Sequence, residues 1–132
     1  MEKLIMNLGA SKNHFGAYSE NCEGIYAAGN SIEEVKADTL EAIRLLKKNL
    51  PESQWPDVIK GDFEIEWKTD VASFLEYYSS IMSLAGLEKI TGINQRQLSN
   101  YLNHRSQPRR PQVERINKGL RDFANTLLSF TL

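Results

Sequence analysis

Five side chains that can read DNA bases are concentrated between residues 94 and 103. Glutamine and asparagine can each form two hydrogen bonds with adenine, and arginine can do the same with guanine. If this segment is a helix, Leu98 and Leu102 face inward and the five polar residues face outward. They are Gln95, Arg96, Gln97, Ser99 and Asn100. The spacing predicts a recognition helix for the major groove of double-stranded DNA; an ordinary polar helix surface is the alternative.

The residues before this segment predict a second helix and a tight turn. Gly92 can adopt the positive φ that ends a helix over residues 84–91, and Asn94 can cap the helix that follows. Ile93 is expected to fill the space between the helices, and Gly86 to be the small residue at their contact. The expected inner face consists of Leu87, Ile90, Leu98 and Leu102. This layout is a helix-turn-helix.

The charge of the chain is divided unevenly between its halves. Residues 1–70 contain 8 Lys or Arg and 13 Asp or Glu, a net charge of −5. Residues 71–132 contain 8 and 4 of these groups, a net charge of +4. A basic half next to an acidic one indicates nucleic-acid binding, and a merely solvated basic face is the alternative.

Length and composition limit the classes of protein to which the chain can belong. The 132 residues allow one ordinary domain or two small ones, and 41% apolar with 25% charged residues is typical of a globular protein. No apolar run is long enough to span a membrane, and the first residues do not fit a signal peptide, so a cytoplasmic protein is expected. The single cysteine, Cys22, excludes an internal disulfide, and no cofactor is expected.

The residue pattern of the acidic half predicts a small sheet with one helix. Strands are expected over residues 4–8, 14–19, 25–28 and 62–68, with Asn13 in the first turn. The helix is expected to begin at a capping box of Ser31 and Glu34 and to end before Pro51. From residue 70 onward four helices are expected, over residues 70–81, 84–91, 94–103 and 111–129. The predicted fold class is α+β, a β-β-β-α-β unit followed by an all-α unit.

Catalysis is not expected in the acidic half. His14 and Cys22 have no obvious catalytic partner nearby in the sequence. Glu64 and Glu66 lie opposite the apolar side of their strand, whereas a metal-dependent nuclease needs inward carboxylates from several strands. We therefore predict no catalytic residue and no metal site, with a decayed or novel nuclease as an alternative.

Residues 83–120 resemble the Cro/repressor type of helix-turn-helix. The resemblance is carried by Thr91-Gly92-Ile93, Gln95, Leu98-Ser99, Tyr101 and the basic, proline-containing loop that follows. In that family this loop contacts the DNA backbone. The resemblance therefore implies phosphate contacts for Asn103, Arg105, Arg109 and Arg110. The chain departs from the family at His104, where glycine often ends the helix, and in the longer loop through Pro108.

Residues 3–68 resemble the HicB antitoxin family. The matching elements are Phe15-Gly-Ala-Tyr18, Gly24-Ile25, Gly29-Asn30-Ser31-Ile-Glu-Glu34 and Glu41-Ala42-Ile43, and Glu23-Gly24-Ile25 replaces the family's PGC element. The resemblance implies a partial ribonuclease-H-like domain over residues 1–69 that binds a small, basic, HicA-like toxin. The DNA-binding domain would then occupy residues 70–132. Candidate toxin-binding residues are Glu20, Glu23, Glu64 and Glu66.

The last predicted helix indicates self-association. Its apolar residues recur at heptad-like spacings, and they are Val113, Ile116, Leu120, Phe123, Leu127 and Phe130. The first three are expected to pack within the domain. Phe123, Leu127 and Phe130 are expected to meet a second copy in a homodimer or a higher even oligomer, which would present two recognition helices to a palindromic operator.

Together these features favour an antitoxin of a type II toxin-antitoxin system. The acidic half would neutralise an mRNA-cleaving toxin, and the basic half would repress the antitoxin's own operon. The alternative is a one-component transcriptional regulator whose N-terminal domain senses a small ligand.

Overall fold

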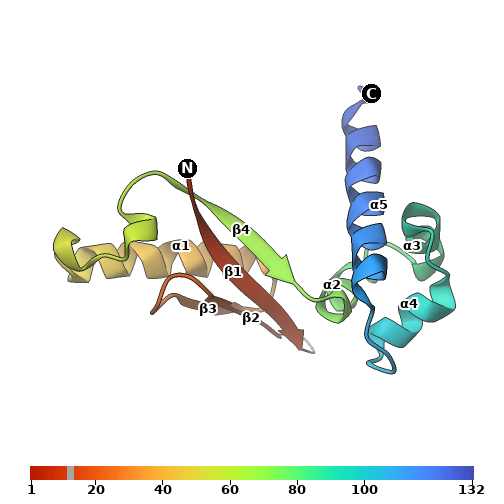
Figure 1. The fold of residues 1–132 in the computed structure, drawn as a ribbon, viewed down its shortest axis with the longest axis horizontal. Coiled ribbons are helices and arrows are strands. Elements are labelled where there is room, and N and C mark those ends of the chain that lie inside the picture. Colours follow the sequence, from red (N-terminus) through yellow and green to blue (C-terminus); the bar gives the residue numbers. More distant parts are fainter. Residues whose placement is uncertain (12–13) are drawn as a thin grey trace. The chain divides into compact units, whose positions relative to one another are not determined.

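The chain folds into two compact units, Met1–Asp70 and Val71–Leu132, in a computed structural model that describes residues 1–11 and 14–132 (Figure 1). The first unit contains a four-stranded mixed sheet and one long helix. The second unit is built from four helices. The predicted α+β class is confirmed, and the predicted turn at Asn13 lies outside the described residues.

The sheet combines an antiparallel meander with a parallel edge strand. Its strands are β1 (Glu2–Ser11), β2 (His14–Ser19), β3 (Tyr26–Gly29) and β4 (Phe63–Thr69). Their order is β3-β2-β1-β4, and β4 pairs in parallel with β1. β1 extends beyond the predicted residues 4–8 because it has partners on both sides, with β4 along its first part and β2 along its second.

Helix α1 (Ile32–Asn49) begins at the predicted capping box. The N–H of Glu34 donates to the Ser31 hydroxyl oxygen at 3.1 Å. The Glu34 carboxylate accepts from the N–H of Asn30 at 2.6 Å, one residue earlier than the usual capping-box partner. Leu50 is the C-cap of the helix, and two 3-10 turns, Glu52–Gln54 and Asp57–Ile59, lead from it to β4.

The core of the first unit lies between α1 and one face of the sheet. The helix contributes Val35, Thr39 and Ile43. Thr39 is fully buried, and its hydroxyl donates to the Val35 carbonyl at 2.9 Å, which satisfies the polar group inside the helix. The sheet and the segments next to it contribute Leu4, Met6, Leu8, Phe15, Ala17, Cys22, Ile25 and Ala27.

Strand β3 meets α1 at close range. A side chain at Gly29 would place its Cβ 2.6 Å from the Glu34 Cβ and 3.1 Å from the Val35 nitrogen, so this position requires glycine. One residue earlier, the backbone N–H of Ala28 donates to the Asp38 carboxylate at 2.9 Å. The helix therefore satisfies a backbone donor at this edge of the sheet.

The burial of β4 alternates as predicted. Phe63, Ile65 and Trp67 are half-buried, and the residues between them are exposed. The Lys36 ammonium of α1 lies 5.7 Å from the centre of the Trp67 ring, so the apolar side of β4 faces α1. Alternation and strand register place another group of residues on the opposite side, which we call the open face. They are Lys3, Ile5, Asn7, Gly16, Tyr18, Tyr26, Glu64, Glu66 and Lys68.

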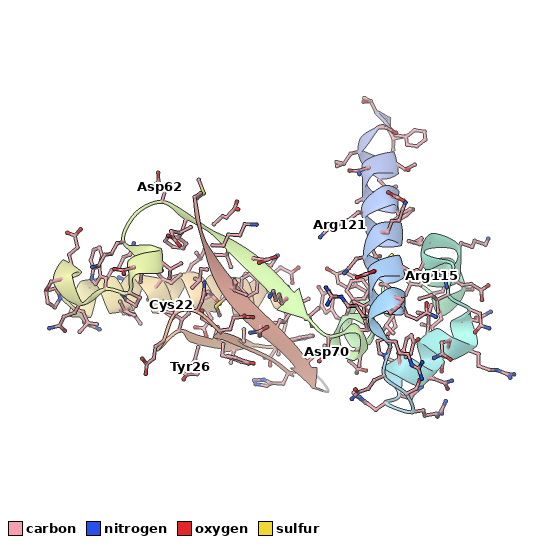
Figure 2. All side chains as sticks on the ribbon, in the orientation of Figure 1. Cys22, Tyr26, Asp62, Asp70, Arg115 and Arg121 are labelled. Atoms are coloured by element: carbon pink, nitrogen blue, oxygen red, sulfur yellow. The ribbon has the colours of Figure 1, made fainter. Side chains whose placement is uncertain are left out.

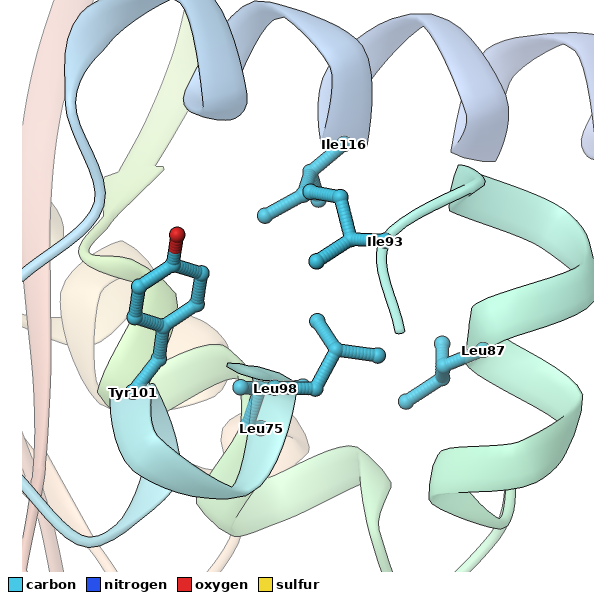
Figure 3. Packing of buried hydrophobic residues seen from close by; sticks show 6 residues of the cluster. All are labelled: Leu75, Leu87, Ile93, Leu98, Tyr101 and Ile116. Atoms are coloured by element: carbon cyan, nitrogen blue, oxygen red, sulfur yellow. The ribbon is translucent and has the colours of Figure 1, made fainter. Parts of the chain in front are cut away.

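The helices of the second unit enclose a separate core. They are α2 (Val71–Tyr78), α3 (Leu84–Thr91), α4 (Gln95–Leu102) and α5 (Arg110–Leu128). Figure 3 shows the buried side chains that converge from these helices and from the turn before α4. They are Leu75, Leu87, Ile93, Leu98, Tyr101 and Ile116. Helix α2 is shorter than the predicted 70–81, because the N–H groups of Ile81 and Met82 both donate to the Tyr78 carbonyl in a turn.

The prediction that Gly86 is the small residue at a helix contact is wrong. A Cβ at Gly86 would meet only the hydroxyl of Ser83, on the residue that caps the same helix. The close contact lies instead between α3 and α5, at Gly119. A Cβ there would overlap the Ile90 carbonyl and lie 2.9 Å from the Thr91 Cα. Glycine is thus needed where α5 crosses the end of α3.

Candidate functional site

Three sets of contacts fix the turn between α3 and α4. Gly92 has a φ of +75°, as predicted, and its N–H donates to the Glu88 carbonyl. Ile93 is only 3% exposed and belongs to the core. Arg115 of α5 donates to the Gly92 carbonyl at 2.8 Å. Figure 2 shows Arg115 on the side of α5 that faces α3, whereas Arg121 projects from the other side.

The first turn of α4 is capped by two side chains. The Asn94 side-chain oxygen accepts from the N–H of Gln97 at 2.9 Å, which is the predicted cap. The Glu88 carboxylate of α3 accepts from the N–H of Gln95 at 2.8 Å. Because one of these acceptors belongs to the preceding helix, the start of α4 is fixed relative to α3.

Four of the five predicted base-reading residues lie on what we call the outer face of α4. Gln95 and Arg96 are exposed, and Ser99 and Asn100 are half-buried. The Asn100 side-chain oxygen accepts from Arg105 at 3.5 Å, a long and weak hydrogen bond. Gln97 differs from the others, because it is half-buried and its amide donates to the Ser106 hydroxyl at 3.4 Å. The structure therefore brings four of the residues together and directs Gln97 toward the following loop.

The end of α4 is closed by a residue in a left-handed conformation. His104 has a φ of +60°, at the position where the sequence lacks the expected glycine. The N–H of His104 donates to the Tyr101 carbonyl at 3.2 Å, and the N–H of Arg105 to the Asn100 carbonyl at 2.9 Å. These two bonds form a Schellman motif, which glycine usually ends.

The predicted phosphate-binding residues are all exposed. Arg109 is the N-cap of α5 by its backbone, and its side chain makes no capping hydrogen bond. Asn103 donates to the Ser99 carbonyl at 2.9 Å, and Arg105 to Asn100 as described. Arg110 forms an exposed ion pair with Glu114 at 3.3 Å. The loop and the first residue of α5 thus present three guanidinium groups to solvent, close to the end of α4 in the sequence.

Two residues support this site in roles that were not predicted from the sequence. Tyr101 was not expected in the inner face, yet it is only 3% exposed. It follows Leu98 by three positions, so the helical period would have indicated it. Arg115 lies 23 residues from the Gly92 carbonyl that it binds, and no local pattern signals such a contact.

The predicted toxin-binding acids lie in the first unit. Glu64 and Glu66 are on the open face. Glu20, just after β2, pairs with Lys68 at 3.6 Å and accepts from Asn7 at 3.1 Å, which brings it to the same face. Glu64 lies 3.9 Å from Lys3. Glu23 is exposed in the turn between β2 and β3. The acids therefore lie among lysines rather than in a purely acidic patch.

The predicted dimerisation residues are exposed, in contrast to the first part of the same seam. Ile116 is 5% exposed, whereas Phe123 is 38% and Leu127 56% exposed. Phe130 is 69% exposed and lies beyond the end of α5. The second half of α5 thus carries an uncovered apolar stripe.

The last candidate groups are the Cys22 thiol and side chains that could ligate a metal ion. Cys22 is a free, buried thiol, and burial raises its pKa. Among residues 1–11 and 14–132, no three His, Cys, Asp or Glu side chains are grouped in a way that could hold a metal ion. Within the same residues, no helix has both the length and the apolar character that crossing a membrane requires.

Comparison of the chain with protein-family models, with curated proteins and with solved structures finds no match. The interpretation of the two candidate surfaces therefore depends on the residues described above.

Proposed function

We propose that the chain is an antitoxin of a type II toxin-antitoxin system. Its second unit would bind operator DNA through α3 and α4 as a helix-turn-helix and repress its own operon. Its first unit would bind and neutralise a small, basic, HicA-like toxin. The outer face of α4 is the observation that carries the DNA-binding part of this proposal.

Three properties of α4 support DNA binding. Gln95 and Arg96, the exposed members of its outer face, are of the types that pair with base edges. They lie at the N-terminal end of the helix, which enters the groove in motifs of this kind. The helix contains no acidic residue, and its unit has a net charge of +4. The three arginines of the following loop and the start of α5 would neutralise phosphates and fix the register without reading sequence.

The first unit supports toxin binding by its charge and architecture. A net charge of −5 can attract a basic, RNA-binding partner and speed its association. A meander of three strands, a helix and a parallel fourth strand is compatible with a partial ribonuclease-H-like domain. Glu20, Glu64 and Glu66 are the candidate contacts on its open face.

The uncovered stripe of α5 supports a homodimer. Phe123 and Leu127 continue the seam of Ile116 past the point where the unit's own helices cover it. A second copy of α5 is the occupant that fits a heptad-like stripe, and pairing by two-fold symmetry would present two α4 helices to one operator.

The DNA-binding proposal is tested by gel shift against the chain's own promoter at several salt concentrations. Gln95→Ala and Arg96→Ala should each weaken binding by about 1–3 kcal/mol and relax the preference at one base pair. Arg109→Ala should weaken all sequences alike and reduce the salt slope by about one unit. Arg44→Ala, an exposed arginine of the first unit, is the charge-matched control and should have little effect.

Toxin binding is tested by co-purification of the tagged chain with the product of the neighbouring gene. We expect a small basic protein whose toxicity the chain suppresses, and combined Glu64→Ala and Glu66→Ala substitutions should weaken the complex. A stable protein that captures no such partner and suppresses no toxicity would eliminate the antitoxin proposal while leaving DNA binding intact.

Self-association is tested by sedimentation. Phe123→Ser and Leu127→Ser should raise the dimer dissociation constant by about tenfold or more, because each removes buried apolar area. Leu128→Ser is the matched control, since Leu128 is 83% exposed and lies off the seam. Equal effects of all three substitutions would argue against pairing along this stripe.

A further inference from the structure

A row of four side chains crosses the open face of the first unit. The strand register pairs Tyr26 with Tyr18, Tyr18 with Asn7, and Asn7 with Lys68. Directly paired residues on one face of a sheet hold their side chains about 5 Å apart. The four strands therefore present two neighbouring phenol rings, an amide and an ammonium group in a continuous line.

The two tyrosines of this row are unusually accessible. Tyr26 is 70% and Tyr18 54% exposed, and Figure 2 shows Tyr26 projecting from β3 on the side away from α1. Tyrosine is enriched in protein interfaces, where its ring supplies contact area and its hydroxyl group a polar end. Two adjacent exposed rings on a regular strand are thus a candidate contact surface.

A hollow lies beside Tyr18 because the neighbouring positions lack side chains. Gly9 and Gly16 leave the space open, and even a Cβ at Gly9 would meet no other atom within 4 Å. The hollow measures about 610 Å³, and it is lined by Asn7, Leu8, Gly9, Gly16, Tyr18, Lys68, Thr69 and Asp70. One long side chain of a partner can enter a space of this size.

Carboxylates flank the hollow. Asp70 lines it directly, and Glu20 reaches its rim through Lys68, 3.6 Å away, and through Asn7, 3.1 Å away. The Lys68–Glu20 pair is half-exposed, so little energy opposes its exchange for another cation. A guanidinium group can lie flat on a tyrosine ring and donate two hydrogen bonds to one carboxylate, which an ammonium group cannot do.

We propose that the open face binds a basic protein partner by accepting an arginine side chain in this hollow. The guanidinium stacks on Tyr18 and pairs with Glu20 in place of Lys68, and Tyr26 extends the contact along the partner chain. Single-stranded nucleic acid also stacks on exposed aromatic rings, but the −5 charge of this unit opposes a polyanion. The inference rests on the proposed toxin-binding role and names the residue type that the partner must supply.

The test is an NMR titration of the isotopically labelled full chain with three probes. They are a blocked six-residue peptide of alternating arginine and glycine, the same peptide with lysine, and a six-residue thymidine oligonucleotide. We expect the arginine peptide to shift the amide signals of residues 7, 18, 26 and 68, with an affinity about fivefold higher than that of the lysine peptide.

Substitutions identify the groups responsible. Tyr18→Ala and Glu20→Gln should each weaken arginine-peptide binding by about fivefold to tenfold, and Tyr26→Ala by less. Glu41→Ala, which removes a carboxylate from α1, should leave it unchanged. Unchanged tryptophan fluorescence, from Trp55 and Trp67 of the same unit, verifies that the variants remain folded.

The outcomes separate this inference from the proposed function. Equal binding of the arginine and lysine peptides, signal shifts elsewhere, or tighter binding of the oligonucleotide would each overturn the arginine site. None of these results would affect the gel shift or the co-purification. Conversely, a chain that captures no toxin could still bind the arginine peptide at Tyr18, and the site would then serve another basic partner.

Discussion

The outer face of α4 and the open face of the sheet differ in what holds their side chains in place. The outer-face residues Gln95, Arg96, Ser99 and Asn100 project from a helix that is fixed by contacts behind it. Those contacts come from Asn94, Glu88 and Arg115. The open face depends only on strand register, and its charged groups pair with one another across the strands. The helix therefore requires remote support to present a surface, whereas the sheet presents its surface as soon as the strands pair.

Because of this difference, fold stability and partner recognition depend on the same residues in the second unit and on different residues in the first. Substitutions behind α4 should damage both the fold and the presentation of the outer face. Substitutions on the open face should leave the fold almost unchanged and affect only a partner. Four predictions test the contrast, from the largest effect to the smallest.

Gly119→Ala should destabilise the second unit by about 3 kcal/mol, because the new methyl group overlaps the Ile90 carbonyl of α3. Both tryptophans, Trp55 and Trp67, belong to the first unit, so their fluorescence reports that unit alone. In urea, the part of the helical signal at 222 nm that comes from the second unit should be lost earlier, while the tryptophan transition and the contribution of α1 stay in place. Gly86→Ala is the matched helical control and should be nearly neutral; if it were the more damaging of the two, the assigned helix contact would be wrong.

Asn94→Ala should lower the free energy of unfolding of the second unit by about 1 kcal/mol, because the N–H of Gln97 loses its acceptor. Asn100→Ala removes the same side chain from the outer face of the same helix and should cost less than about 0.5 kcal/mol. In the gel shift, Asn100→Ala should weaken DNA binding at least as much as Asn94→Ala. A large loss of stability from Asn100→Ala would show that the outer face is structural.

His104→Gly should raise the stability of the second unit by about 1 kcal/mol, because glycine adopts a φ of +60° without steric cost. Thermal unfolding followed at 222 nm measures the change. His104→Ala, which keeps the Cβ, is the control and should give no gain. A loss of stability in the glycine variant would mean that the histidine side chain contributes more than the strained backbone costs.

Lys68→Met should change the stability of the first unit by less than about 0.5 kcal/mol, because its ion pair with Glu20 is half-exposed. Urea unfolding followed by tryptophan fluorescence measures this directly. Ile59→Ala, at a position that is 0% exposed in the core of the same unit, should cost about 2–4 kcal/mol and serves as the reference. A comparable loss for both would place the charges of the open face among the determinants of the fold.

Local sequence patterns predicted most of the helices and strands, and for several of them the side that faces the core. Period-two alternation located β4 and its apolar side, and the capping box located the start of α1. Both succeeded because each pattern is contained within a few consecutive residues. Gly92, Ile93 and Asn94 have the predicted roles for the same reason. The outward direction of Gln95, Arg96, Ser99 and Asn100 followed from the helical period.

Contacts between distant segments were not predicted. Gly119 lies far from Ile90 in the sequence, and no helical pattern distinguishes a glycine at a crossing from one that merely occurs in a helix such as Gly86. The Tyr18–Tyr26 pair was missed because strand register, rather than composition, places the two rings side by side. The loop contact of Gln97 was missed because the path of residues 104–109 has no periodic signal.

The bond between the Ala28 amide and the Asp38 carboxylate has a consequence for how this protein behaves when it is concentrated. An unpaired strand edge can recruit strands from other molecules and start fibril growth. At one edge of the sheet, β3, the Ala28 N–H already donates to α1. At the other edge, β4, every second residue is charged: Glu64, Glu66 and Lys68. Both edges thus discourage strand addition, and a partner is left to approach the sheet from its open face.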